Sequence, residues 1–208
     1  MNIPRSEHPR PGFVRSSWLN LNGQWNFEID QGRSGEYRGL HKEGTTLNST
    51  ILVPFCPESS LSGVEYKDFM ASVWYKRTIH LDTLSGQVRL HFGAVDYRCK
   101  VFVNGKSVGE HKGGYTSFSF DITDALCEGE NTVTVCAQDD TRSPHQPSGK
   151  QSYKYESFGC FYTRTTGIWQ TVWLEWVDPC YIKEVYLTPR ASEGTLDVRV
   201  VTSAPLHA

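Results

Sequence analysis

The chain has 208 residues, a length typical of one large domain or of one domain with part of a second. Its 21 lysines and arginines nearly balance 23 aspartates and glutamates, so the net charge is only -2. This balance provides no field that attracts nucleic acid or an anionic membrane, and we expect neither as a partner. No apolar run approaches the roughly 20 residues that span a bilayer, and the start lacks the apolar segment of a signal peptide. We therefore expect a cytoplasmic protein.

The six cysteines include no Cys-x-x-Cys pair, and Cys99, Cys136 and Cys160 lie in apolar or aromatic stretches. We expect reduced thiols rather than disulfides, with buried positions for these three. The seven histidines show no metal-ligand spacing, so no metal site is predicted. The glycine-rich phosphate-binding motifs are also missing, and no cofactor is predicted.

Alternation of apolar and polar side chains, bounded by Gly, Pro, Asn and Asp, recurs along the chain and predicts strands with one buried face. The apolar spacing of an amphipathic helix is not sustained over three turns anywhere. In chain order the predicted strands cover residues 25–30, 50–53, 73–81, 87–92, 97–103, 106–108, 118–122, 132–137, 168–177, 182–187 and 195–201. Such strands without crossover helices favour an all-β fold, and a jelly-roll β-sandwich fits best.

Turn and loop signals connect these strands. Asn104-Gly105 predicts a hairpin with a two-residue turn, because both residues accept the positive φ that a type I′ turn requires. Polar stretches at 54–69 and 139–154 predict long surface loops of the kind that are often functional. Because long connections of an antiparallel sandwich collect at its ends, we expect blocks 57–68 and 150–164 at the same end.

Three regions follow from these patterns. Residues 1–17 contain Pro4, Pro9 and Pro11 among charged residues and predict an extended N-terminal arm. Residues 18–178 form the jelly-roll sandwich. Residues 179–208 supply two strands, too few to enclose a core, and predict the start of a second, truncated β domain.

Acidic residues on the long loops are of the type that a glycosidase uses as a pair of carboxylates flanking the scissile bond. The sequence does not show that any two of them converge, and solvated loop charges far outnumber catalytic ones. Asp96 and Asp121, next to hydrophobic strands, fit hydrogen-bonding roles at turns or strand ends. No catalytic residue is therefore assigned. The loop candidates are Glu58, Glu65, Asp68, Asp139, Asp140 and Glu156.

Six ordered sequence blocks resemble the N-terminal sugar-binding domain of glycoside hydrolase family 2, which contains β-galactosidases and β-glucuronidases. The resemblance runs from about Trp18 to Val177. The blocks are WLNLNGQW at 18–25, VPF at 53–55, VWYKR at 73–77, LHFGAVDY at 90–97 followed by VFVNG at 101–105, GGY at 113–115 followed by FSFDIT at 118–123, and TGIWQ at 166–170.

The resemblance implies a galactose-binding-domain-like jelly roll, followed by an immunoglobulin-like domain and a catalytic (β/α)₈ barrel with the glutamates of a retaining mechanism. Such a barrel needs about 250 residues and eight helices, which this chain cannot supply. We therefore expect the chain alone to be inactive. Its expected partners are a saccharide substrate and the missing barrel of the same polypeptide, with a homo-oligomer as a further possibility.

In family members, loops of the first domain help to shape the sugar pocket. Many place an aspartate six residues before the glycine of the Gly-Ile block, whereas this sequence has Phe161 there and lacks that hydroxyl acceptor. Polar or aromatic groups nearby are our candidates for substrate binding, with a structural role in fixing the loop as the alternative for each. They are Lys150, Gln151, Tyr162 and Arg164.

The leading hypothesis is thus the sugar-binding domain of a family 2 β-glycosidase. A free-standing carbohydrate-binding module or lectin is the alternative, because a jelly roll with aromatic loops is also that architecture. An adhesion or interaction sandwich without sugar affinity is a third hypothesis.

Overall fold

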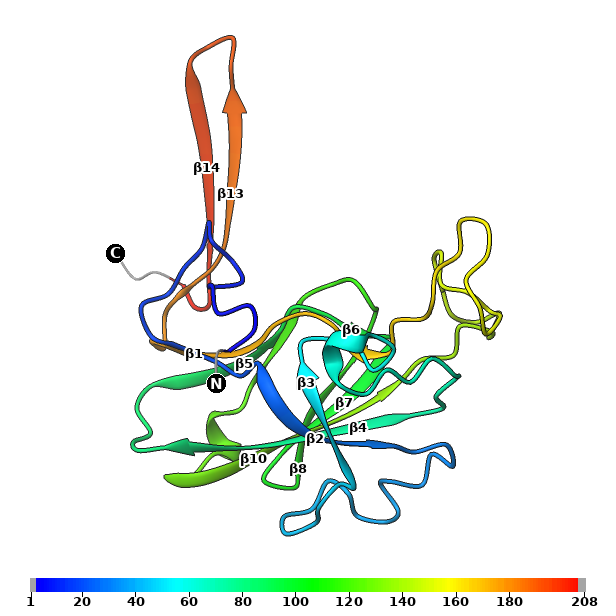
Figure 1. The fold of residues 1–208 in the computed structure, drawn as a ribbon. Coiled ribbons are helices and arrows are strands. Elements are labelled where there is room, and N and C mark those ends of the chain that lie inside the picture. The colour runs from blue at the N-terminus through cyan, green and yellow to red at the C-terminus, as the bar shows by residue number, and fades with distance from the viewer. Residues whose placement is uncertain (1–2, 206–208) are drawn as a thin grey trace.

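The structure, a computed structural model, describes residues 3–205 and consists of strands with two short 3₁₀ turns (Figure 1). One antiparallel sheet has the order β3-β2-β4-β10-β7-β8, and a second has the order β1-β12-β5-β9. The larger sheet contains β3 (Ser49–Val53), β2 (Gly23–Ile29), β4 (Val73–Leu81), β10 (Gly129–Gln138), β7 (Arg98–Val103) and β8 (Lys106–Lys112). The smaller contains β1 (Trp18–Asn20), β12 (Val172–Val177), β5 (Gln87–Phe92) and β9 (Phe118–Asp121).

The remaining elements are short or lie apart from these sheets. Strand β6 (Val95–Asp96) pairs with β11 (Gly167–Ile168), and β13 (Ile182–Arg190) pairs with β14 (Thr195–Thr202). The 3₁₀ turns are η1 (Ser60–Ser62) and η2 (Thr123–Ala125).

Side chains from both sheets form one apolar core, because alternate residues of each strand point to the same side. Phe27 of β2 meets Tyr75 of β4 edge to face, with ring centroids 5.2 Å apart. Phe92 of β5 and Leu174 of β12 approach from the smaller sheet and are fully buried. The all-β sandwich predicted from the sequence is therefore confirmed.

The hairpin between β7 and β8 also has the predicted turn. Asn104 and Gly105 have φ values of 49° and 74°, and Val103 pairs with Lys106. Both φ values lie in the left-handed region that a type I′ turn needs.

The prediction of one continuous strand over residues 168–177 was wrong. Trp169, Gln170 and Thr171 leave the strand, so that β11 pairs with β6 while β12 pairs with β5. Polar contacts fix the break: the Asn22 side chain accepts the Val172 N–H at 3.0 Å, and the Trp169 indole donates to the Gly114 carbonyl at 2.8 Å. These contacts come from Asn22 between β1 and β2 and from Gly114 in the turn after β8, and they are invisible in local alternation.

The thiols follow the expectation only in part. All six cysteines are free, Cys99 is fully buried, and Cys136 is half-buried beneath Ser72. Burial of Cys160 was a wrong prediction, because this residue is exposed in the turn between Phe158 and Phe161. An aromatic neighbourhood in the sequence is therefore a poor sign of burial in a loop.

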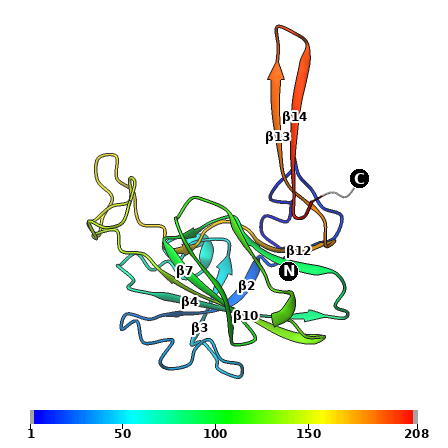
Figure 2. The ribbon, with the colours of Figure 1, turned by 180° about the vertical axis from the view of Figure 1, so that it is seen from behind.

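The β13–β14 hairpin projects away from the sandwich, and the N-terminal arm lies at its base (Figures 1 and 2). All nine residues of β13 are exposed. Apolar side chains such as Val185, Leu187 and Val198 remain 39 %, 61 % and 56 % exposed. Large uncovered apolar side chains of this kind mark a contact surface.

Candidate functional site

Two long loops meet at one end of the sandwich. Residues 54–72 connect β3 to β4, and residues 139–166 connect β10 to β11. Part of the second loop extends from the sandwich as the yellow segment in Figures 1 and 2. As expected from the sequence, blocks 57–68 and 150–164 lie together, since Arg164 binds the Lys67 carbonyl and Glu58 binds the Thr166 N–H.

Arg164 fastens the two loops to each other. Its side chain is 3 % exposed, and its guanidinium lies 4.3 Å from the ring centroid of Phe69. A guanidinium presents several N–H donors in a fixed plane, so it can serve several acceptors at once. Here it donates to the backbone carbonyls of Lys67, Ser152, Lys154 and Tyr155.

Gln151 joins the loop to the short strand β6. Its Nε2 donates to the Asp96 carboxylate at 2.9 Å, and its Oε1 accepts the Thr165 N–H at 2.7 Å. Burial raises the pKa of Asp96 to about 6, and the Gln151 bond opposes that rise. Gly114 must be a glycine here, because a Cβ on it would lie 2.3 Å from the Asp96 Oδ1.

Two more carboxylates are buried near Asp96. We call the region around these three acids, where the long loops join the sandwich, the loop base. Glu58 accepts the Thr166 N–H with both oxygens at 3.1 Å, and burial raises the pKa of Glu58 to about 7. Burial and the nearby Asp96 charge raise the pKa of Asp139 to about 7. Asp139 accepts from Gln146 with Oδ1, while its Oδ2 has no hydrogen-bond partner among residues 3–205. The three acids hold the loop base rather than face solvent.

The outer surface of this end is aromatic and polar. The hydroxyls of Tyr115 and Tyr162 are 3.0 Å apart, and their side chains are 62 % and 41 % exposed. Tyr115 also meets Trp169 edge to face, with centroids 5.5 Å apart. An exposed ring with a hydroxyl can pack on the apolar face of a sugar and hydrogen bond at its edge.

The family described as "Glycosyl hydrolases family 2, sugar binding domain" matches residues 19–174. The chain belongs to glycosyl hydrolase family 2.

Among curated family 2 relatives, a β-galactosidase from Thermoanaerobacter pseudethanolicus is 32 % identical over 141 residues, which are 66 % of this chain and 18 % of that protein. A β-glucuronidase from Streptococcus agalactiae is 29 % identical over 123 residues, covering 57 % of this chain and 19 % of the relative. The chain thus spans less than a fifth of either relative's length.

Solved family 2 structures share the fold. Ruminococcus gnavus β-glucuronidase has a TM-score of 0.73 at 19 % identity, covering 96 % of this chain and 34 % of that one. Lactobacillus rhamnosus β-glucuronidase has a TM-score of 0.72 at 21 % identity, covering 92 % and 34 %.

The four substrate-binding candidates fall into two pairs in this family 2 domain. Lys150 and Tyr162 are exposed, and the Lys150 carbonyl accepts the Tyr162 N–H at 2.9 Å. Gln151 and Arg164 are buried, with their side chains engaged by the protein as described above. The first pair can reach a ligand, whereas the second pair holds the loop that presents it.

Phe161 occupies the position at which the sequence departs from the family pattern. Its ring stacks on Phe158 with centroids 4.9 Å apart, and Tyr153 meets both rings at their edges. The Lys154 ammonium lies 4.4 Å from the Phe158 centroid. An aromatic cluster with the Lys154 ammonium over one ring therefore occupies this point of the loop.

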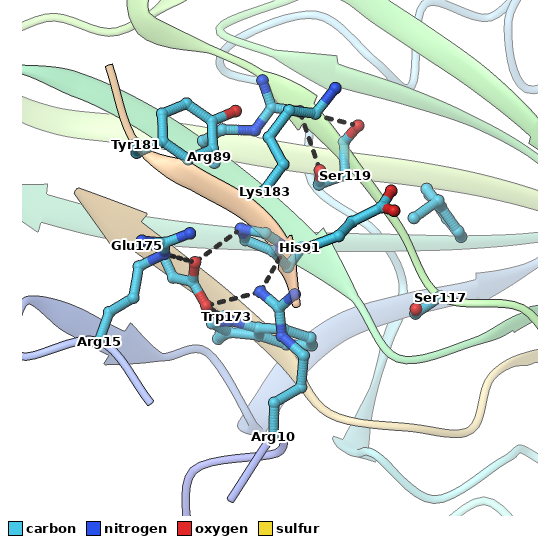
Figure 3. A pocket seen from close by; sticks show the side chains of 12 residues that line it. Arg10, Arg15, Arg89, His91, Ser117, Ser119, Trp173, Glu175, Tyr181 and Lys183 are labelled. Atoms are coloured by element: carbon cyan, nitrogen blue, oxygen red, sulfur yellow. Dashed lines mark hydrogen bonds and ion pairs between the residues drawn. The ribbon is translucent and has the colours of Figure 1, made fainter. Parts of the chain in front are cut away.

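A second polar cluster lies on the smaller sheet, where Arg10 and Arg15 of the N-terminal arm meet Glu175 (Figure 3). Glu175 of β12 accepts from Arg10 at 2.8 Å and from Arg15 at 2.6 Å, and it is 1 % exposed. Arg15 also donates to the Ile182 carbonyl at 2.6 Å. Burial opposes ionisation, yet neighbouring His91, Trp173 and Arg10 keep the pKa of Glu175 well below its usual range. Arg15 of the arm thus links the Glu175 carboxylate of the sandwich to the first residue of the hairpin.

Residues 3–205 contain no helix long and apolar enough to cross a membrane. No group of three or more His, Cys, Asp or Glu side chains in that range is placed to hold a metal ion.

Proposed function

We propose that this chain is the substrate-binding N-terminal part of a family 2 β-glycosidase that hydrolyses O-glycosidic bonds in carbohydrates. The observation that carries the proposal is the loop end, where Arg164 locks two loops together beneath the exposed Tyr115–Tyr162 pair. The β-galactosidase and β-glucuronidases that the chain resembles support a substrate of that type.

Catalysis in this proposal resides outside the chain. A retaining glycosidase needs two carboxyl groups about 5 Å apart on either side of the anomeric carbon. Glu58, Asp96 and Asp139 are all buried, with Glu58 bound to a backbone N–H and Asp96 bound to an amide side chain. The proposed source of the acid/base and nucleophile is a (β/α)₈ barrel of the same polypeptide, with the loop end facing it.

The β13–β14 hairpin fits the same division of the protein. Its strands pair over eight residues of β14, and its apolar side chains are uncovered on both faces. Two strands form a marginal structure unless a further layer covers them. We assign these two strands to the start of an immunoglobulin-like sandwich. The Arg15 contact with the Ile182 carbonyl connects them to the N-terminal arm.

In the proposed site Tyr162 and Lys150 contact the saccharide, and Gln151 and Arg164 position them. Tyr162 offers a ring face and a hydroxyl, and Lys150 offers an ammonium donor. The hydrogen bond with Tyr162 raises the pKa of Tyr115 to about 12, so the Tyr115 phenol stays protonated at neutral pH.

The test is calorimetric titration of the chain with an aryl β-galactoside and an aryl β-glucuronide, together with an assay of their hydrolysis. We expect binding without turnover, and a loss of binding of about tenfold in Tyr162→Ala, since removal of one sugar-contacting ring costs about 1 kcal/mol or more. Tyr37→Ala is the matched control, because Tyr37 is 97 % exposed in another loop. Sustained turnover by the repurified chain, or equal binding by both variants, would refute the proposal.

A further inference from the structure

A groove separates the N-terminal arm from the loop end of the sandwich. Its walls come from the arm, from the segment after β3 and from the break between β11 and β12. Its volume is about 620 Å³, within the roughly 300–1,000 Å³ typical of small-molecule sites. The residues that matter below are Arg5, Glu7, Phe55, Trp169 and Gln170.

Both walls are fixed by partly buried hydrogen bonds. On the arm side, Asn20 donates to the Arg5 carbonyl at 2.8 Å and Asn22 donates to the Pro4 carbonyl at 3.1 Å. Asn22 is fully buried and also holds the start of β12. On the sandwich side, the Trp169 indole is held by the Gly114 carbonyl. A groove with such walls is preformed, so a ligand binds it with little ordering cost.

The groove offers two half-buried aromatic rings, Phe55 and Trp169, and planar polar side chains around them. Among residues 3–205, the side chains of Arg5, Glu7 and Gln170 have no hydrogen-bond or ion-pair partner. The formal charges of Arg5 and Glu7 cancel, which disfavours an anionic or cationic ligand. The groove therefore suits a neutral saccharide. Its aromatic rings can pack on the apolar face of a sugar, and its planar polar side chains can donate to and accept from the sugar hydroxyls.

Trp169 also connects the groove to the surface described above. The same side chain lines the groove and meets Tyr115, whose hydroxyl is 3.0 Å from that of Tyr162. We propose that the groove binds the distal units of a neutral β-linked oligosaccharide whose terminal unit lies at the Tyr115–Tyr162 pair. This inference rests on the proposed function and narrows its substrate class from simple glycosides to extended saccharides.

The experiment compares ligand length. The chain is titrated by calorimetry with the β-linked disaccharides and tetrasaccharides of glucose, mannose, xylose and galactose. At least one tetrasaccharide is expected to bind about tenfold more tightly than its disaccharide, as one added aromatic stack allows. Phe55→Leu and Gln170→Ala should abolish this length advantage and leave disaccharide binding unchanged. Gln24→Ala, at an exposed position on β2, is the matched control and should change neither.

The outcomes separate the two proposals. If Tyr162→Ala weakens every ligand but tetrasaccharides never exceed disaccharides, the groove proposal is overturned and the proposed function stands. If tetrasaccharides still bind more tightly than disaccharides in both groove variants, the groove is not the source of that difference and the groove proposal is overturned. If no saccharide binds at all, both proposals are overturned.

Discussion

The guanidinium of Arg164 lies over the ring of Phe69, so the loop before β11 is stacked on the loop before β4. The same guanidinium donates to carbonyls in both loops. A single buried side chain therefore sets the relative position of the two segments that form the proposed sugar-binding end. The sequence suggested this residue as a ligand contact, and the structure gives it a positioning contact.

Replacing Arg164 by alanine should release the two loops. The variant leaves buried carbonyls without donors, a loss on the order of 3 kcal/mol in the free energy of unfolding. Urea denaturation measures that loss, and limited proteolysis should cut first within residues 139–166. Arg142→Ala is the control, because Arg142 also lies over Phe69, at 3.9 Å, but is exposed. Equal effects from the two variants would show that stacking alone, and not the carbonyl contacts, holds the loops.

The buried acids at the loop base should make the fold more stable in mild acid. Burial raises the pKa of Glu58 from 4.5 to about 7, so the folded state binds the proton more tightly than the unfolded state. The resulting stabilisation is complete below about pH 4.5 and is lost as the pH rises through 7, a change of roughly 3 kcal/mol. Asp96 and Asp139 act in the same direction.

Glu58→Gln keeps an acceptor for the Thr166 N–H and removes the charge. We expect this variant to be more stable than the wild type at pH 8 and similar at pH 4.5, as measured by urea denaturation at both values. Glu156→Gln changes an exposed glutamate of the loop between β10 and β11 and should leave the pH dependence intact. A Glu58→Gln variant with a lower free energy of unfolding than the wild type at pH 8 would contradict this account.

Glu175 should behave in the opposite way. Its pKa is lowered in the folded state, so its stabilisation is present above the unfolded value of 4.5 and is lost as the pH falls below it. Glu175→Gln leaves Arg10 and Arg15 without their anion, and breaking a buried pair typically costs about 3–5 kcal/mol. Denaturation at pH 7 and protease cleavage near the arm report the loss. Glu110→Gln, which removes an exposed pair with Arg98, should have little effect.

Gly114→Ala tests the close approach of backbone to Asp96. The added methyl group would lie 2.3 Å from the carboxylate, and forced overpacking costs about 1–3 kcal/mol. A loss of that size lowers the Tm by several degrees in a domain of this length. Gly12→Ala is the control, since no atom lies within 4 Å of its added Cβ. An unchanged Tm in Gly114→Ala would mean that the Asp96 side chain or the backbone shifts at little cost in free energy.

The sequence was most informative where local rules decide the structure. Alternation predicted β4 and β5 at their observed bounds, and Asn104-Gly105 predicted its turn. It missed β1 and β6, which are only two or three residues long and depend on distant partners. The strand break at Trp169 was missed for the same reason, because Gly114 and Asn22 hold it from connections far away in the sequence.

The site was predictable only in outline. The long tyrosine-rich loops were predicted to lie at one end of the sandwich, where the structure brings them together. The bond between Gln151 and Asp96, in contrast, joins residues on separate elements and leaves no local pattern. Asp96 looked like an ordinary strand-end residue, and Tyr115 was noticed only as part of a family block. Side-chain burial, which distinguishes Arg164 from Tyr162, depends on how the loops fold over each other.

The most direct test of the sugar-binding end is an NMR titration of the isotope-labelled chain with methyl β-galactoside and methyl β-glucuronide at millimolar concentration. We expect the amide signals of Tyr115, Lys150 and Tyr162 to shift in a saturable way with at least one glycoside, while those around Glu175 stay in place. Saturable shifts confined to the Glu175 side, or none anywhere on the chain, would contradict the central claim that this loop end binds the substrate.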